Sequence, residues 1–374
     1  MRILMDSRML YSSGIGRYIR CILSGMARLD EDFSFDLRGD PAEFYRFINE
    51  EQVDHRRFDH RTYTPAIYGF REQVEGSLRL QAKHSDIVHI PHFNAPWLMP
   101  DSCVVTVHDL IPFKFAERHN PLRVKAGLQV LKNAVEKAAR IIVVSDATAS
   151  DLIQLFPSNR VKAKIRRTYL GVSEMFHPLG RAEIEHFKLQ NDLGDYVLYV
   201  GNRLPHKNLG RLARAMSILQ GDFPGLQLVV AGKRFLENDD LDEARRSGQC
   251  GPIIEWGTAG DDELVKLYSG ARVLAFPSLL EGFGLPAIEA MACGTPVVVS
   301  NIGSLPEVAG SGGICVDPYK VEDIARGIHK VLSDSSLRSR LSEHGLEQAS
   351  RFRWEDTARQ TMQIYHEVLD ERPS

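Results

Sequence analysis

Cysteine is scarce in this chain, and its few copies are arranged neither as bridges nor as metal ligands. The five cysteines are Cys21, Cys103, Cys250, Cys293 and Cys315, and no two of them form a Cys-x-x-Cys pair. Scattered cysteines in odd number are typical neither of a disulfide framework nor of a zinc site. We therefore expect a protein of a reducing compartment, which excludes the small disulfide-stapled folds.

Long apolar runs are absent as well. No stretch approaches the roughly 18 consecutive apolar residues of a membrane-spanning helix. The N-terminal MRILMDSRML also lacks the longer apolar core of a signal peptide. We therefore expect a cytoplasmic protein without a membrane span, and peripheral contact with the inner face of the cytoplasmic membrane is compatible with this expectation.

The composition that remains is that of an ordinary globular protein. The 374 residues are 43% hydrophobic and 25% charged, and this length suits two domains of average size. Charge is uneven: residues 1–178 carry 25 Lys and Arg against 21 Asp and Glu, and the remainder carries 21 against 28. The basic first half favours an anionic partner, either a phospholipid surface or a pyrophosphate-bearing acceptor. We expect no nucleic-acid partner.

Short apolar runs rich in β-branched residues alternate with longer helical patterns. The runs lie at 3–5, 86–90, 104–107 and 141–144, and again at 197–200, 226–231, 274–276 and 296–299. Such alternation predicts an α/β fold with two doubly wound parallel sheets. The periodicity breaks between Leu170 and Gly180, which predicts a hinge there. We assign 1–175 to the first domain and 176–355 to the second, with a last helix in 356–374 crossing back onto the first.

The segment PSLLEGFGLPAIEAMACGT (277–295) follows an apolar strand and opens a helix. Gly282 and Gly284 let the backbone approach a ligand closely, and the N–H groups at the start of the helix favour a phosphate. Glu281 lies in the loop and Glu289 lies about one turn inside the helix, so the two carboxylates can contact different parts of one ligand. The alternative for Glu289 is a carboxylate that complements the helix dipole.

Residues 281–298, EGFGLPAIEAMACGTPVV, resemble the signature of the retaining glycosyltransferases of family 4, which have the GT-B fold. The resemblance implies two Rossmann-like domains facing across a cleft, the first binding the acceptor and the second a nucleotide diphosphate sugar. It implies that Glu281 contacts hydroxyls of the donor sugar and that Glu289 binds the ribose hydroxyls. The donor-binding residues implied by this segment are Glu281, Gly282, Phe283, Gly284, Leu285 and Glu289.

A second segment, YVGNRLPHKNL (199–209), is similar to the part of the same family in which an Arg and a Lys neutralise the donor diphosphate. The resemblance places Gly201 in the donor site and gives Arg203 and Lys207 the catalytic role of the two cations. Fixed cations stabilise the charge that builds on a departing nucleotide diphosphate, and they would replace a divalent metal. We therefore expect no metal and no cofactor. Ordinary surface charge is the other interpretation of these two residues.

Metal-dependent glycosyltransferases commonly use an Asp-x-Asp site, and the chain contains two such patterns. They are Asp240-Leu-Asp242 and Asp30-Glu-Asp32. Both lie in acidic segments without a preceding apolar strand, so we interpret them as chance matches in solvated segments rather than as metal sites.

Two features of the first domain complete the expected site. YSSGIGRY (11–18) is a glycine-rich turn after the first strand, and the family pattern places Gly14 and Gly16 opposite the donor diphosphate. Tight turns also use glycine for conformational reasons alone. His108 follows the strand 103–107, at a carboxyl end where ligands bind in open α/β sheets. The resemblance gives His108 a contact with the donor sugar, and a structural histidine bonded to Asp109 is the alternative.

The resemblance also bears on mechanism and substrate. It offers no carboxylate behind the anomeric carbon, so we expect front-face attack rather than double displacement. The chain is similar to bacterial GDP-mannose-dependent α-mannosyltransferases of polysaccharide assembly, which implies a glycan or a lipid-linked saccharide as acceptor. A UDP-sugar donor, a nucleotide-sugar 2-epimerase and a non-catalytic nucleotide-sugar binding protein are the alternatives.

Membrane contact is a further expectation for the first domain. The helical segment 121–140 mixes apolar residues with Lys and Arg, and the basic run 160–167 follows it. One face of such a segment can lie on an anionic membrane beside a lipid-linked acceptor. An ordinary helix with a solvated face is the other interpretation, and the composition of the segment favours it slightly.

Overall fold

The computed structural model describes residues 1–81, 85–118, 120–237 and 239–371. The chain divides into two compact units, one made of Met1–Gly171 with Arg353–Ser374 and the other of Val172–Phe352. The chain enters the second unit after Gly171 and leaves it after Phe352. Both boundaries lie a few residues before those expected from the sequence, which follow residues 175 and 355. The reason is local packing of the two crossing segments: a Cβ on Gly171 would lie 2.2 Å from the Trp354 nitrogen, and Val172 N–H donates to Phe352 O at 3.0 Å.

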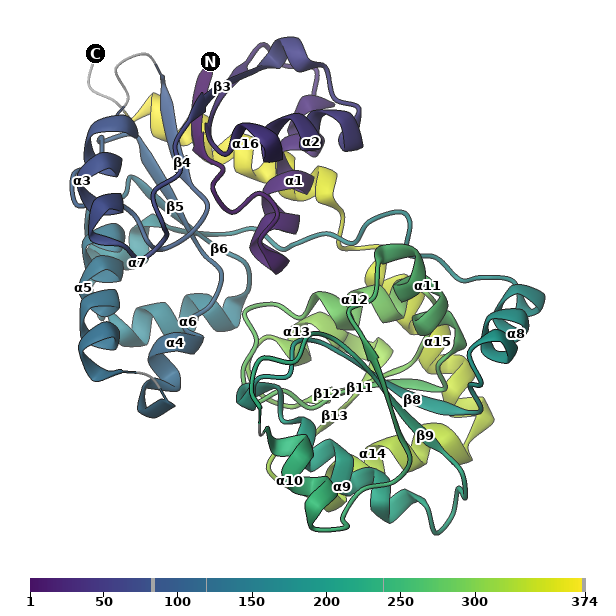
Figure 1. The fold of residues 1–374 in the computed structure, drawn as a ribbon. Helices are drawn as coiled ribbons and strands as arrows, with labels where there is room; N and C mark the ends of the chain where they lie inside the picture. Colours follow the sequence, from purple (N-terminus) through teal and green to yellow (C-terminus); the bar gives the residue numbers. More distant parts are fainter. Residues whose placement is uncertain (82–84, 119, 238, 372–374) are drawn as a thin grey trace. The chain divides into compact units, whose positions relative to one another are not determined.

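The first unit is built on a parallel sheet with strand order β3-β2-β1-β4-β5-β6-β7 (Figure 1). The strands are β1 (Arg2–Asp6), β2 (Ser34–Gly39), β3 (Phe58–Thr62), β4 (Ile87–Ile90), β5 (Cys103–Val107), β6 (Arg140–Val143) and β7 (Ile165–Arg167). The central strands β4, β5 and β6 are buried throughout, because helices cover both faces of the sheet.

Helices connect these strands and cover the sheet. They are α1 (Ser13–Ala27), α2 (Pro41–Glu51), α3 (Phe70–Arg79), α4 (Ile111–Lys114), α5 (Pro121–Lys137), α6 (Asp146–Leu155), α7 (Asn159–Lys164) and the final helix α16 (Trp354–Asp370). Leu131, Ala134 and Val135 of α5 pack on one face of the sheet. On the other face α16 packs along α1 and contributes Tyr365, whose hydroxyl lies 2.6 Å from His89 Nδ1 on β4.

The second unit has a parallel sheet with strand order β10-β9-β8-β11-β12-β13. Its strands are β8 (Tyr196–Val200), β9 (Gln227–Ala231), β10 (Ile253–Gly257), β11 (Val273–Phe276), β12 (Val297–Ser300) and β13 (Gly313–Val316). Its helices are α8 (Arg181–Gln190), α9 (Leu209–Leu219), α10 (Asp240–Arg246), α11 (Asp261–Gly270), α12 (Leu285–Ala292), α13 (Leu305–Ala309), α14 (Val321–Ser333) and α15 (Ser335–Ala349). The α/β class with two doubly wound parallel sheets is confirmed.

Each sheet has one point where the strand order reverses direction. In the first unit this switch point lies between β1 and β4, and in the second it lies between β8 and β11. At such a point the loops after the two strands diverge to opposite faces and leave a crevice at the carboxyl ends, where open α/β sheets bind ligands. Within the described ranges, no helix is long and apolar enough to cross a bilayer.

Candidate functional site

The loops after β8 and β11, at the switch point of the second unit, are bonded directly to each other. Leu279 N–H donates to His206 O at 2.7 Å. The Asn208 amide donates to Pro277 O at 2.9 Å and to Pro318 O at 2.7 Å. Asn208 has φ 63°, a left-handed conformation that asparagine tolerates better than most residues. These bonds bring two distant stretches of sequence to one edge of the sheet.

Lys207 and Glu281 meet where these two loops join. Lys207 Nζ lies 2.7 and 2.9 Å from the two carboxylate oxygens of Glu281, and both side chains are largely buried. The ammonium also lies 5.1 Å from the centre of the Phe276 ring. A partly desolvated cation beside a carboxylate can bind an anionic group and a hydroxyl group of one ligand at the same time.

Glycines open the backbone around this pair. Gly201 follows β8 with φ 150°, and Gly232 follows β9 with φ 153°, where a Cβ would lie 2.0 Å from Gly201 O. Gly284 precedes α12 with φ 112°, and a Cβ there would lie 2.6 Å from Leu305 Cδ2. All three conformations favour glycine, and the loops can therefore pass close to each other and to a ligand.

The rest of the EGFGL segment shapes the start of α12. Phe283 is buried and its ring packs edge-on against Phe352 at 5.5 Å, while Ser304 Oγ donates to Phe283 O at 2.7 Å. Gly282 is partly exposed in the loop, and Leu285 is the first residue of the helix. The side chain of Phe283 therefore packs inside the unit, and its contribution to donor binding stays a prediction.

Glu289 lies in the second turn of α12 and is 4% exposed. One of its carboxylate oxygens accepts a hydrogen bond from the Tyr268 hydroxyl at 2.8 Å. A buried carboxylate needs such donors, since an unpaired charge in the interior is costly. The ribose role remains a prediction for Glu289.

The Arg203 side chain lies in a cluster of carboxylates. Its guanidinium binds Asp239 through two bonds of 2.6 and 2.8 Å and Glu255 at 2.5 Å, and the side chain is 2% exposed. These contacts tie the loop after β8 to the start of α10 and to β10. A contact between Arg203 and the donor diphosphate stays a prediction, and it would require exchange of a carboxylate for a phosphate.

The acidic stretch beside Arg203 is not solvated as the sequence suggested. Asp240 accepts from Gly210 N–H at 2.8 Å, and burial raises its pKa, while Asp242 binds Arg234 at 2.6 Å. The expectation of solvated acids was wrong here because α9 and the Arg234 side chain cover this turn. In the part of the chain that the structure describes, no group of three or more His, Cys, Asp or Glu is placed to hold a metal ion.

In the first unit, His108 lies directly after β5. Its Nε2 is 3.0 Å from Pro91 O, and its ring meets Tyr18 edge-on at 4.8 Å. A carbonyl oxygen only accepts, so Nε2 carries the proton and Nδ1 has the lone pair in the neutral ring. Burial lowers the pKa of His108 to about 4, and the ring is therefore neutral near pH 7. Asp109 accepts from Ile111 N–H at 2.9 Å.

The glycine-rich segment of the first unit forms the first turn of α1 rather than a turn before it. Gly14 has open space around it, so no packing requirement explains it. A Cβ on Gly16 would lie 2.7 Å from Leu10 O, so Gly16 allows the helix to pack against the preceding loop. Contact of either glycine with a diphosphate stays a prediction.

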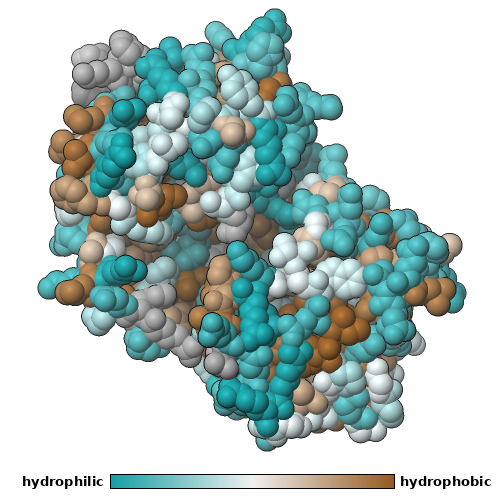
Figure 2. Space-filling model, in the orientation of Figure 1, coloured by the Kyte–Doolittle hydropathy of each residue, from teal (hydrophilic) through white to brown (hydrophobic). Residues whose placement is uncertain are grey.

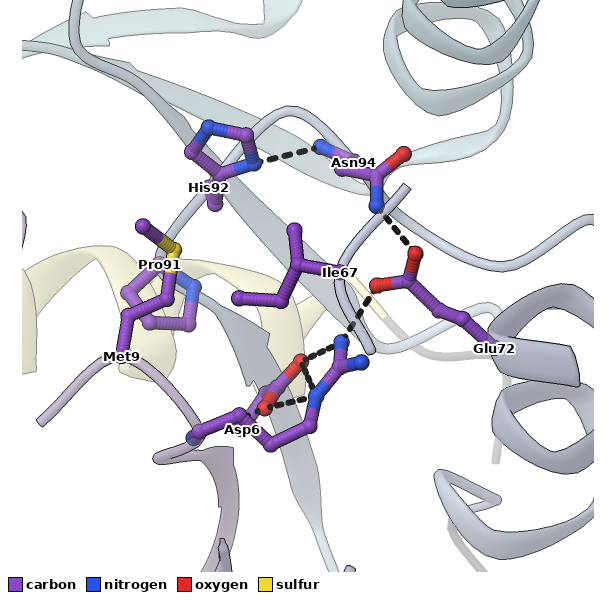
Figure 3. Close-up of a pocket in the computed structure, with 8 residues that line it drawn as sticks. Asp6, Met9, Ile67, Glu72, Pro91, His92 and Asn94 are labelled. Carbon is purple, nitrogen blue, oxygen red and sulfur yellow. Dashed lines mark hydrogen bonds and ion pairs between the residues drawn. The ribbon is translucent and has the colours of Figure 1, made fainter. Parts of the chain in front are cut away.

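A buried polar cluster, which we did not predict from the sequence, lies at the switch point of the first unit (Figure 3). Arg8 Nη2 lies 2.6 Å from Asp6 Oδ2 and 2.6 Å from Glu72 Oε1, and all three side chains are under 10% exposed. The Asn94 amide donates to the other Glu72 oxygen, and His92 Nδ1 accepts from Asn94 N–H at 3.1 Å. The cluster lines a small pocket between the ends of β1 and β4.

In this cluster burial and ion pairing shift the pKa values of Arg8 and Glu72 in opposite directions. Burial alone would lower the pKa of Arg8, but Asp6 and Glu72 outweigh it and raise that pKa. Burial raises the pKa of Glu72 despite Arg8, and it lowers the pKa of His92 to about 3. The available sequence signal was the pair Asp6 and Arg8 directly after the first apolar strand; nothing marked Glu72 within its helix.

Two family descriptions match the chain. Residues 181–348 match "Glycosyl transferases group 1", and residues 12–174 match "Glycosyltransferase Family 4". The first match lies within the second unit and contains both Lys207 and Glu281. The second match begins at the start of α1 and includes His108.

Curated relatives agree with these matches. The chain is 37% identical over 286 residues to O-antigen chain mannosyltransferase B of Escherichia coli, which covers 75% of this chain and 74% of that protein. It is 30% identical over 298 residues to the serotype-specific mannosyltransferase WbdA of Escherichia coli, covering 76% of this chain and 36% of WbdA. The chain thus spans about a third of the length of WbdA.

Among solved structures, HepE of Anabaena in complex with UDP and glucose has a similar fold. The TM-score is 0.77 at 18% sequence identity, over 98% of this chain and 100% of HepE. At this identity the likeness shows the fold alone, which is GT-B.

Proposed function

The chain belongs to the group 1, family 4 glycosyltransferases, and from this membership we propose that it transfers mannose from GDP-mannose with retention of configuration. The acceptor would be a glycan or a lipid-linked saccharide in the assembly of a bacterial polysaccharide. The mannose donor is supported by the relatives from Escherichia coli, which are both named mannosyltransferases.

The contact between Lys207 and Glu281 is the observation that carries this proposal. Lys207 would neutralise the diphosphate as it departs, and Glu281 would accept hydrogen bonds from hydroxyls of the donor sugar. Because the two groups are bonded to each other at 2.7 and 2.9 Å, a bound donor would insert its phosphate and sugar beside an existing ion pair. Glu289 would bind the ribose hydroxyls.

The proposed chemistry is front-face attack on the anomeric carbon. A phosphate oxygen of the departing nucleotide would take the proton of the acceptor hydroxyl as the new glycosidic bond forms on the same face. Lys207 would stabilise the charge that develops on the diphosphate, with Arg203 as a second cation. No divalent metal and no cofactor enters this scheme.

The first unit would bind the acceptor. His108 is neutral near pH 7, and it would contact the donor sugar through a hydrogen bond rather than through charge. Gly14 and Gly16 would face the diphosphate through the start of α1. Peripheral contact with an anionic membrane would bring a lipid-linked acceptor to this unit.

A UDP-sugar donor is the second candidate, because HepE, which shares the fold, binds UDP and glucose. Calorimetric titration of EDTA-treated protein with GDP, UDP and ADP separates the two donors. We expect preferential binding of GDP without metal, followed by transfer of mannose from GDP-mannose, with the anomeric configuration of the product read by NMR. Preferential binding of UDP would refute the mannose donor. Conversion of a UDP-sugar without any acceptor would instead identify an epimerase.

A further inference from the structure

Helix α3 of the first unit exposes apolar side chains along one face. Phe70 is 86% exposed, Val74 is 48% exposed and Leu78 is 72% exposed. Residues four apart lie on the same side of a helix, so these three form a stripe about 12 Å long. In Figure 2 brown, apolar residues gather at the left edge of the first unit, where Figure 1 places α3.

The loop between β4 and β5 extends this stripe. Trp97 is 42% exposed and Leu98 is 62% exposed. The loop is fixed beside α3, because Leu98 N–H donates to Ser77 Oγ at 3.2 Å and a Cβ on Gly76 would lie 3.1 Å from Pro96 Cβ. We call Phe70, Val74, Leu78, Trp97 and Leu98 the α3 patch.

Basic side chains border the α3 patch. Arg71 and Arg79 lie on α3 with 80% and 55% of their side chains exposed, and they share the single carboxylate of Glu75. Lys137 at the end of α5 donates to Trp97 O at 2.7 Å. This acceptor is neutral, so the bond does not cancel the charge of Lys137. On α3 two arginines therefore face one carboxylate, and Lys137 adds a third positive charge.

We propose that the α3 patch is the surface by which this protein lies on an anionic lipid bilayer. Phe70 and Leu78 would enter the boundary between headgroups and acyl chains, and Trp97 would lie at headgroup level, where indole rings are enriched. Arg71, Arg79 and Lys137 would face the anionic headgroups. The proposal gives a surface to the membrane contact proposed above, and it depends neither on the donor sugar nor on catalysis.

Two other assignments fit the described side chains less well. The segment 121–140, which the sequence suggested as the membrane face, buries the apolar side chains of the second half of α5 against the sheet. It exposes one large apolar side chain, Leu122, among polar and charged positions, whereas the α3 patch exposes five. A second copy of the chain would meet this patch about a two-fold axis. Such a contact would bring the basic borders of the two copies together, which is unfavourable in an interface.

Sedimentation of the full chain with lipid vesicles tests the proposal. We expect binding to vesicles that contain phosphatidylglycerol and little binding to vesicles of phosphatidylcholine alone. The double variant Phe70→Ser/Leu78→Ser should bind the anionic vesicles at least tenfold more weakly, since two exposed apolar side chains are lost. The matched control is Leu189→Ser in α8, a leucine that is 81% exposed on the second unit and whose loss should leave vesicle binding unchanged.

Trp97 supplies a second readout that a folding defect would not imitate. Its fluorescence should shift to shorter wavelength with anionic vesicles, and Trp97→Phe should abolish the shift while nucleotide binding stays intact. Equal vesicle binding by wild type and the double variant would overturn the proposal. Equal binding of the wild type to anionic and neutral vesicles would also overturn it. A third contrary result would be a wild-type dimer in light scattering that becomes a monomer in the double variant.

Discussion

The two units have the same kind of sheet and the same kind of switch point, but they use them differently. In the second unit the loops after β8 and β11 present one cation and one carboxylate, Lys207 and Glu281, beside glycines that leave the backbone open. In the first unit Arg8, in the loop after β1, lies between Asp6 at the end of β1 and Glu72 of α3, in a cluster where most hydrogen-bonding groups are already paired. Lys207 and Glu281 can still form hydrogen bonds to a ligand, whereas the groups around Arg8 mainly bond to one another and stabilise the fold of the first unit.

Their electrostatics differ in the same sense. The first unit keeps three buried histidines neutral, because burial lowers the pKa of His89 and His92 to about 3 and that of His108 to about 4. The second unit has the salt bridge between Lys207 and Glu281 at the edge of its sheet. Charge that develops during transfer would therefore be met mainly by the second unit, and shape and hydrogen bonding would come from the first.

The scaffold role of the first cluster is tested most directly by Arg8→Met. This change leaves Asp6 and Glu72 buried without their cation, so the free energy of unfolding of the first unit should fall by about 3–5 kcal/mol. Urea unfolding followed by hydrogen exchange in β1 and α1 measures the loss. Arg71→Met, at an arginine 80% exposed, should change stability by less than about 0.5 kcal/mol. A stable Arg8→Met protein that has lost acceptor binding would show that the cluster is itself a site.

The ligand role of the second pair is tested by Glu281→Gln. Glutamine keeps one acceptor oxygen but loses the second one and the negative charge, so it cannot bind Lys207 and the sugar hydroxyls together as the carboxylate does. Turnover should fall about 10²–10³-fold with little change in donor affinity. Steady-state kinetics and calorimetry on the same preparation separate the two quantities. Glu322→Gln, on the exposed face of α14, is the control. A fall in donor affinity that matches the fall in turnover would assign Glu281 to ground-state binding.

The ribose role of Glu289 predicts a smaller effect. Glu289→Ala should weaken nucleotide binding by about 1.5–3 kcal/mol, because charged hydrogen bonds to the ribose are lost. Tyr268→Phe removes the hydroxyl that is 2.8 Å from the same carboxylate, and it should leave nucleotide affinity nearly unchanged. Equal nucleotide affinity in wild type and Glu289→Ala would leave Glu289 with a structural role only.

Neutral histidines predict the pH dependence of the first unit. His89, His92 and His108 are protonated near pH 6.5 in the unfolded chain, but only near pH 3 to 4 in the folded unit. The unfolded state therefore binds more protons below about pH 6.5, and stability should fall as pH drops from there, by up to about 1.4 kcal/mol per pH unit for each histidine. His89→Gln should remove the contribution of one histidine to this slope, as measured by urea unfolding between about pH 5 and 7.

Most inner strands of the two sheets were predicted from the sequence, whereas the edge strands and the inner strand β2 were not. The sequence of β2, SFDLRG, contains Asp36 and Arg38 and therefore lacks a continuous apolar run. Apolar runs identified β1, β4, β5 and β6 in the first unit and β8, β9, β11 and β12 in the second. Strands β3, β7, β10 and β13 form the outer edges. Their sequences, such as FDHRT and IRR, face solvent in part and lack continuous apolar runs. Only the neighbouring strand determines that such a segment is extended.

The site of the second unit could be predicted from the sequence to a larger extent than the cluster of the first unit. The second unit's loop at 277–295 is contiguous, so its glycines and carboxylates stand together in the sequence. The pairing of Lys207 with Glu281, 74 residues apart, still required the structure. The first unit's cluster takes its members from three separate segments, and Glu72 lies in a helix without a recognisable pattern. The orientation of Arg203 toward Asp239 was equally invisible, because a motif gives the position of a residue but not the direction of its side chain.

The final helix affects the order in which the protein can be assembled during translation. Helix α16 packs along α1, and its Tyr365 hydroxyl is bonded to His89 on β4. One face of the first sheet therefore stays partly uncovered until the ribosome has made residues close to Asp370. The second unit, Val172–Phe352, is one continuous stretch and can be complete earlier, although it starts later in the chain. The unit that begins synthesis is therefore the last to finish folding, and a ribosome stalled before α16 would release a folded second unit attached to an incomplete first one.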